Sequence, residues 1–166
     1  GPYIDPDSNE ILGYQARFVG DAAIERFGDP ATLLLTETDI EARAGDRLLP
    51  AMQQDPITHF QPHSPDEDIE GRILSVLGGV TQIGQFDVVV INKGSADGME
   101  IGHVMKIWRA GETIRDTVGG SRFERVTLPD EEAGMLMVFR AFDRVSFALV
   151  MKATRAIHVH DFVRTP

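Results

Sequence analysis

The chain has 166 residues, of which 42% are hydrophobic, and its formal net charge is −10. This length suffices for one domain or two small ones, which would bury about 70% of the unfolded surface. The acidity argues against nucleic acid as a partner and against a basic lipid-binding patch, because both depend on clustered Lys and Arg. The absence of cysteine excludes disulfides, thiolate nucleophiles and Cys-ligated zinc.

The first part of the chain, residues 1–50, predicts a small β subdomain. Residues 11–19 follow a cluster of turn-forming residues and alternate apolar and polar side chains, as a half-buried strand does. Residues 22–27 fit either a short helix or a strand. Residues 32–36 are an apolar run that predicts a further strand.

Residues 51–70 differ in composition from both flanking regions. They contain three prolines, directly after Pro50, and the acidic run at 66–68. Proline fixes φ and lacks the N–H that a β-ladder needs, so this composition predicts an extended linker between two halves.

The remaining residues, 71–166, predict a larger β domain, and its first strand is expected to start at Glu70, the last residue of the linker. The Val-rich run at 86–92 is typical of a central strand buried on both faces. The polar, Gly-containing stretch at 111–125 indicates an exposed insertion. Further strands are expected over 104–109, 133–142 and 145–153.

One pattern recurs three times, at 31–50, 88–104 and 147–163: an apolar run, a polar turn and a second apolar segment. It predicts an all-β, mainly antiparallel fold, barrel-like or sandwich-like, with at most one or two short helices. The Gly and Asp residues of the pattern are interpreted as structural turns. These are Gly45, Asp46, Gly94, Asp97, Gly98, Gly102 and Asp161.

The histidines do not predict a metal site. His59 and His63 have the i, i+4 spacing of a helical ligand pair, but Pro62 lies between them and argues against a helix. His158 and His160 would share one face of a strand, and the neighbouring aspartate would point the other way and leave no third ligand. We therefore expect no metal ligands.

Catalytic patterns are also missing from the sequence. It has no Gly-x-Ser-x-Gly elbow, and the glycines of 94–102 are not followed by the Lys-Ser/Thr of a phosphate-binding loop. The acidic runs at 66–68 and 130–132 are typical of solvated loops. We expect a non-catalytic protein without a cofactor.

Protein interfaces are enriched in Trp and Arg, and both occur on the alternating segment 104–109. Trp108, the only tryptophan, shares a face with Lys106, and its position in the core or at the surface stays open. The expected partner-binding residues are Trp108, Arg109, Phe86 and Gln82. The loops 78–86, 94–100 and 111–125 would add specificity.

The order and spacing of several segments resemble a known family. These segments are 71–73, 82–85, 88–94, 97–104, 130–131, 133–140, 145–150 and 157–161. They are similar to the C-terminal region of LysM-containing proteins associated with the type IV pilus secretin (the TsaP family), a region that resembles the C-terminal domain of the flagellar protein FlgT. The segments 3–6, 12–14 and 45–50 resemble the part of that family between the LysM module and this domain.

The resemblance implies a periplasmic accessory protein that associates with the outer-membrane secretin and helps to anchor it to the cell wall. In that family the LysM module binds peptidoglycan, and the sequence given does not contain it. A multi-copy ring around the secretin is implied as well. The alternatives are a peptidoglycan hydrolase and a ring-forming scaffold without a secretin partner.

Overall fold

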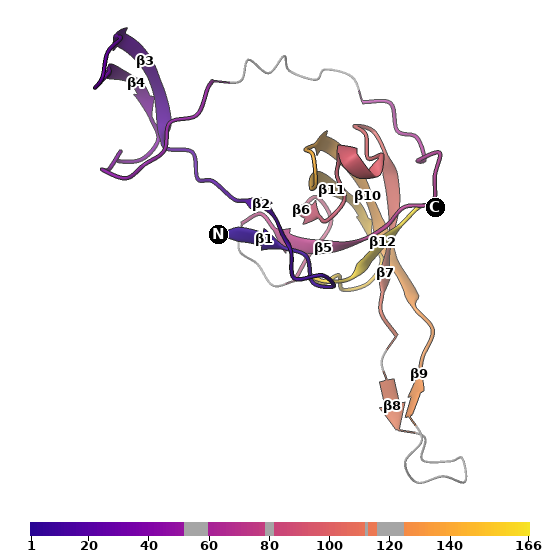
Figure 1. Cartoon of the computed structure of the whole chain (residues 1–166). Helices are drawn as coiled ribbons and strands as arrows, with labels where there is room; N and C mark the ends of the chain where they lie inside the picture. Colours follow the sequence, from indigo (N-terminus) through magenta and orange to yellow (C-terminus); the bar gives the residue numbers. More distant parts are fainter. Residues whose placement is uncertain (52–59, 79–81, 112, 116–124) are drawn as a thin grey trace. The chain divides into compact units, whose positions relative to one another are not determined.

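The computed structural model describes residues 1–51, 60–78, 82–111, 113–115 and 125–166 (Figure 1). These residues form antiparallel strands and one 3-10 turn, η1 (Ser95–Asp97). The all-β, antiparallel prediction is therefore confirmed. The strands are β1 (Pro2–Ile4), β2 (Ile11–Tyr14), β3 (Gly20–Arg26), β4 (Thr32–Thr38), β5 (Glu70–Val76), β6 (Val88–Ile91), β7 (Val104–Arg109), β8 (Thr113–Arg115), β9 (Arg125–Thr127), β10 (Glu131–Ala141), β11 (Ser146–Ala153) and β12 (Phe162–Arg164).

The chain divides into two compact units. The first consists of Gly1 and Gln15–Thr58, and the second of Pro2–Tyr14 and His59–Pro166. These boundaries differ from the expected division at 1–50, 51–70 and 71–166. Residues 2–14 belong to the second unit, and so does much of the expected linker.

The second unit is built on a closed barrel with the strand order β10-β11-β6-β5-β12-β7, in which β7 pairs with β10 to close the ring (Figure 1). Alternate residues of these strands point inward and, together with residues of the connecting segments, form a buried core. Its largest members are Ile73, Ile83, Ile91, Met99, Met105, Ile107, Leu136 and Ile157. Within the described residues, each of the six strands therefore has a paired neighbour on both sides.

The β1–β2 hairpin covers the outer face of the barrel beside β6. Val89 and Ile91 of β6 face the main core, whereas Val90 packs with Tyr3 and Val145 in a second cluster. Burial of β6 on both faces, predicted from its sequence, therefore depends on the N-terminal hairpin.

Polar contacts hold this hairpin to the barrel. The Asn92 amide donates to Asp5 Oδ2 (2.8 Å), and the Arg144 guanidinium makes two hydrogen bonds of 2.8 Å to the Glu10 carboxylate. These contacts join residues more than 80 positions apart in the chain. They explain why residues 2–14 belong with the barrel.

The residues interpreted as structural turns lie in or directly beside turns of the structure. Asp97 Oδ2 accepts a hydrogen bond from Gly94 N (3.0 Å), and Asp161 Oδ2 accepts one from His158 N (2.8 Å). Gly98 follows η1 with φ 78°. In the first unit, Gly45 has φ 104° and Asp46 Oδ2 accepts from Arg43 N (2.8 Å).

Part of the expected linker packs against the barrel. Ile69 is buried, and its N–H donates to Thr165 Oγ1 (2.9 Å). His63 pairs with His103 in an isolated parallel bridge. Residues 52–59 of this stretch lie outside the described residues, as do 116–124 of the expected insertion, whose described ends pair as β8 and β9.

Candidate functional site

The β3–β4 hairpin of the first unit has an unusually apolar surface. Its register pairs Ala22 with Leu35 and Ile24 with Leu33, so these four side chains share one face, called here the β3–β4 apolar face. Residues 22–27, which fitted either a helix or a strand, lie almost entirely in β3.

This face is open to solvent. Ile24 is 53% exposed and Leu35 is 51% exposed, and Leu34 on the opposite face is 58% exposed. Phe18 and Phe27 beside the hairpin are exposed as well. An isolated two-stranded hairpin is at best marginally stable in water, and clustered exposed apolar side chains mark interaction surfaces.

The edges of the hairpin add a second feature. Within the described residues, β3 and β4 pair only with each other, so each strand has one edge without a β partner. Such an edge offers backbone N–H and C=O groups to an added strand. The hairpin thus combines an apolar face with two pairing edges.

The residues expected to bind a partner are distributed over separate parts of the barrel. Trp108 and Arg109 are half-buried on β7, where Trp108 pairs with Glu132 of β10 and Phe162 of β12. Trp108 Nε1 is buried and has no hydrogen-bond partner among the described residues. Trp108 is therefore neither a full core residue nor an exposed anchor.

Phe86 and Gln82 are both exposed, and Phe86 is 66% exposed with φ 70°. Phe86 N donates to Val150 O (2.7 Å), which places it beside β11. Phe86 thus lies in the turn before β6, whereas Trp108 lies on β7. The sequence did not point to the β3–β4 apolar face.

The second expected histidine pair does not lie on a strand. His158 and His160 occupy the turn before β12, where His160 has φ 75°, so the expectation of two rings on one strand face is wrong. His59 lies outside the described residues.

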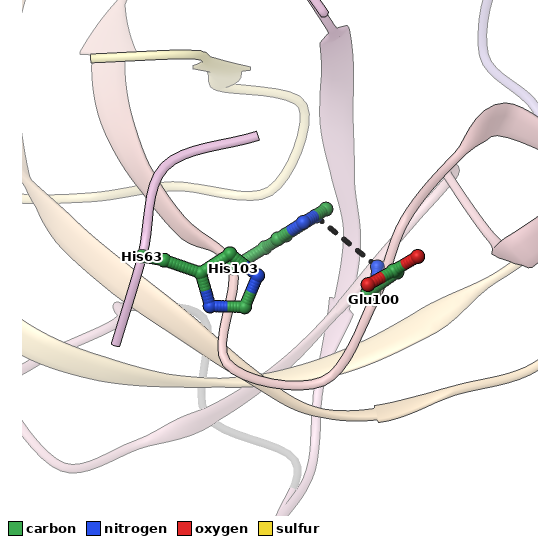
Figure 2. A group of neighbouring side chains, drawn as sticks. All are labelled: His63, Glu100 and His103. Atoms are coloured by element: carbon green, nitrogen blue, oxygen red, sulfur yellow. Dashed lines mark hydrogen bonds between the residues drawn. The ribbon is translucent and has the colours of Figure 1, made fainter. Parts of the chain in front are cut away.

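His63 instead meets two residues that the sequence did not associate with it (Figure 2). One nitrogen each of His63 and His103 and one oxygen of Glu100 lie within 4.8 Å of one another. The two rings are 4.7 Å apart in an edge-to-face arrangement. Burial lowers the pKa of His103, and the neighbouring His63 lowers it further.

The acidic run at 130–132 is engaged in ion pairs. Asp130 accepts hydrogen bonds from Gly111 N (3.1 Å) and from the Arg164 guanidinium (2.8 Å), and Glu132 pairs with Lys106 (3.1 Å). Glycoside hydrolysis requires two carboxylates that flank the scissile bond. These carboxylates are instead occupied in holding β10 and its neighbours together.

The part of the chain that the structure describes contains no helix with the length and apolar character to cross a membrane. No protein-family model matches the sequence, and no curated protein matches it significantly.

Proposed function

We propose that this chain is a non-catalytic assembly module that binds a protein partner through the β3–β4 hairpin, while the barrel serves as a rigid body. The observation that carries the proposal is the β3–β4 apolar face. Ile24, Leu33 and Leu35 are all exposed in the isolated chain.

The expected gain on binding is appreciable. Complete burial of a Leu or Ile side chain stabilises by about 1.5–3 kcal/mol, and these side chains already bury roughly half of their surface. Covering the three of them would therefore contribute about 2–4 kcal/mol before the cost of association. Strand pairing along an open edge of the hairpin would add backbone hydrogen bonds and fix the register of the partner.

The proposed partner is the outer-membrane secretin of the type IV pilus, a choice that rests on the resemblance described above. Secretin association would place the chain in the periplasm, with several copies around one secretin. The cell-wall anchor would be a LysM module outside the sequence given.

The test is co-purification of the chain with purified secretin, compared between variants. Leu35→Asp and Ile24→Asp place a charge on the β3–β4 apolar face and should reduce recovery at least tenfold. Met151→Asp, which alters a 39% exposed side chain on β11, is the matched control and should bind normally.

Equal recovery of the hairpin variants and the control would refute the proposal. Because the hairpin belongs to a different compact unit, thermal unfolding of the barrel should be the same in the Leu35→Asp and Ile24→Asp variants as in the parent chain. Mass photometry of the chain alone distinguishes a self-assembled ring, which would favour a scaffold that needs no secretin.

A further inference from the structure

A side-chain cluster on the barrel, separate from the hairpin, has the composition of a metal site. His63, Glu100 and His103 supply two imidazoles and a carboxylate, the ligands that zinc and neighbouring divalent transition metals accept. His103 is 5% exposed, whereas His63 and Glu100 are exposed and can adjust. The cluster therefore has one fixed ligand and two movable ones.

The backbone brings the two histidines together. His63 N donates to Gly102 O (3.0 Å), and Val104 N donates to His63 O (2.8 Å), which fixes the segment around His63 beside the start of β7. A Cβ on Gly102 would lie 2.5 Å from Gln61 O and 3.1 Å from the His63 ring. Only glycine at this position lets the ring approach so closely.

The hydrogen bonds of His63 leave one ring nitrogen available to bind a metal ion. Its Nδ1 lies 2.8 Å from Gln61 O, and a neutral ring that donates there leaves the Nε2 lone pair free. Metal-bound histidines usually donate their other ring N–H to a carbonyl or carboxylate in this way. Gln61 thus orients the His63 ring for binding through Nε2.

His103 requires one rearrangement. Its Nδ1 accepts a hydrogen bond from Glu100 N (3.1 Å; Figure 2), so a neutral ring carries its proton on Nε2. Binding through Nδ1 therefore replaces this hydrogen bond and leaves the proton on Nε2. The loss of one neutral hydrogen bond is small beside the affinity of zinc for imidazole and carboxylate ligands.

The three ligand atoms need to move only slightly closer together to bind one metal ion. Ligand atoms at 2.0–2.2 Å from a tetrahedral zinc lie about 3.4 Å apart, and those of the cluster lie within 4.8 Å. Rotation of the exposed Glu100 side chain, with a small adjustment of the His63 ring that keeps its hydrogen bond to Gln61 O, can supply the difference. Glu100 and Asp66 both act electrostatically on His103, and their negative charge favours a cation at this position.

We propose that His63, Glu100 and His103 bind one divalent transition-metal ion, with zinc as the best fit and water as the fourth ligand. The ion would fasten the segment at 60–65 to the barrel, at the point where the chain enters the second unit. This inference is independent of the hairpin proposal.

The probe is Zn²⁺, titrated calorimetrically into the chelator-treated full chain, with Mg²⁺ as the comparison ion. We expect one equivalent of Zn²⁺ to bind and to raise the melting temperature, and no heat from Mg²⁺, which prefers oxygen ligands. His63→Ala and Glu100→Gln should each weaken Zn²⁺ binding at least tenfold. Both residues are exposed, so these variants should fold.

His158→Ala is the matched control, because His158 is an exposed histidine outside the cluster. It should bind Zn²⁺ as the parent chain does. Absence of 1:1 binding, or equal affinity in the His63→Ala, Glu100→Gln and His158→Ala variants, would overturn the proposal.

Discussion

Substitution of Gly102 by Ala perturbs the contact that holds residues 60–65 to the barrel. Gly102 has φ 97°, and the added Cβ would lie 2.5 Å from Gln61 O. Gly98→Ala is a matched control, because Gly98 has φ 78° and a Cβ there would meet nothing within 4 Å. The two variants share the cost of a positive φ and differ in the collision.

The magnitudes follow from these contacts. A left-handed conformation costs a non-glycine residue roughly 1–2 kcal/mol, which both variants bear. In Gly102→Ala the displaced segment also weakens the hydrogen bonds from His63 N to Gly102 O and from Val104 N to His63 O. At about 0.5–1.5 kcal/mol each, their loss adds about 1–3 kcal/mol, for a total of roughly 2–5 kcal/mol.

Urea unfolding followed by the fluorescence of Trp108, the only tryptophan, measures both variants on the barrel itself. We expect a lower midpoint for Gly102→Ala than for Gly98→Ala, with similar slopes. In the zinc titration, Gly98→Ala should keep the metal site and Gly102→Ala should lose it. Equal midpoints would show that the packing of Gln61 and His63 on Gly102 contributes nothing to stability, and the reasoning would fail.

Two further predictions concern pH. Burial raises the pKa of Asp161 above its usual 3.8. As the pH rises from about 4, this carboxyl group therefore loses its proton in the unfolded chain before it does so in the folded chain, and the stability of the folded chain falls. Asp161→Asn keeps an acceptor for His158 N, and its stability advantage in urea should grow towards pH 7; an advantage that shrinks would contradict this. The Arg144 guanidinium lowers the pKa of Glu10 below its usual 4.5, so this contribution is complete above that pH and is lost on acidification. Glu10→Gln should therefore lower the urea midpoint at pH 7, and this deficit should shrink as the pH falls below 4.5, whereas a deficit that does not change with pH would exclude the ion pair as the cause.

The strands of the barrel could be predicted because their signals are local. The run of apolar residues at 88–91 predicts burial on both faces, and Val89, Val90 and Ile91 are fully buried. Turn positions such as Gly98 could be inferred from the steric freedom of glycine. These features need no knowledge of which strands pair.

The unit boundaries and the metal site depend on contacts that composition does not encode. The prolines and acidic residues of 51–70 are typical of a linker, yet Ile69 of this stretch is buried through contacts with the other end of the chain. His63 and His103 are 40 positions apart and meet only because the chain returns beside β7. A histidine in a Pro-rich stretch gives no sign of such a partner.

In the part of the chain that the structure describes, the strand edges are paired in the barrel and unpaired in the β3–β4 hairpin. Substitutions in the barrel should therefore change stability, and substitutions in the hairpin should change partner binding. The barrel closes its sheet, and the β1–β2 hairpin covers the apolar outer side chain of Val90, so changes there should act mainly on folding. The β3–β4 hairpin keeps both edges and its apolar face exposed within the described residues, so its side chains contribute little to the folded chain alone. Natural proteins usually protect such edges with charge, proline or a covering element. The proposal of a partner that covers the apolar hairpin therefore has a distinct signature: loss of binding without loss of stability distinguishes a docking surface from a badly packed one.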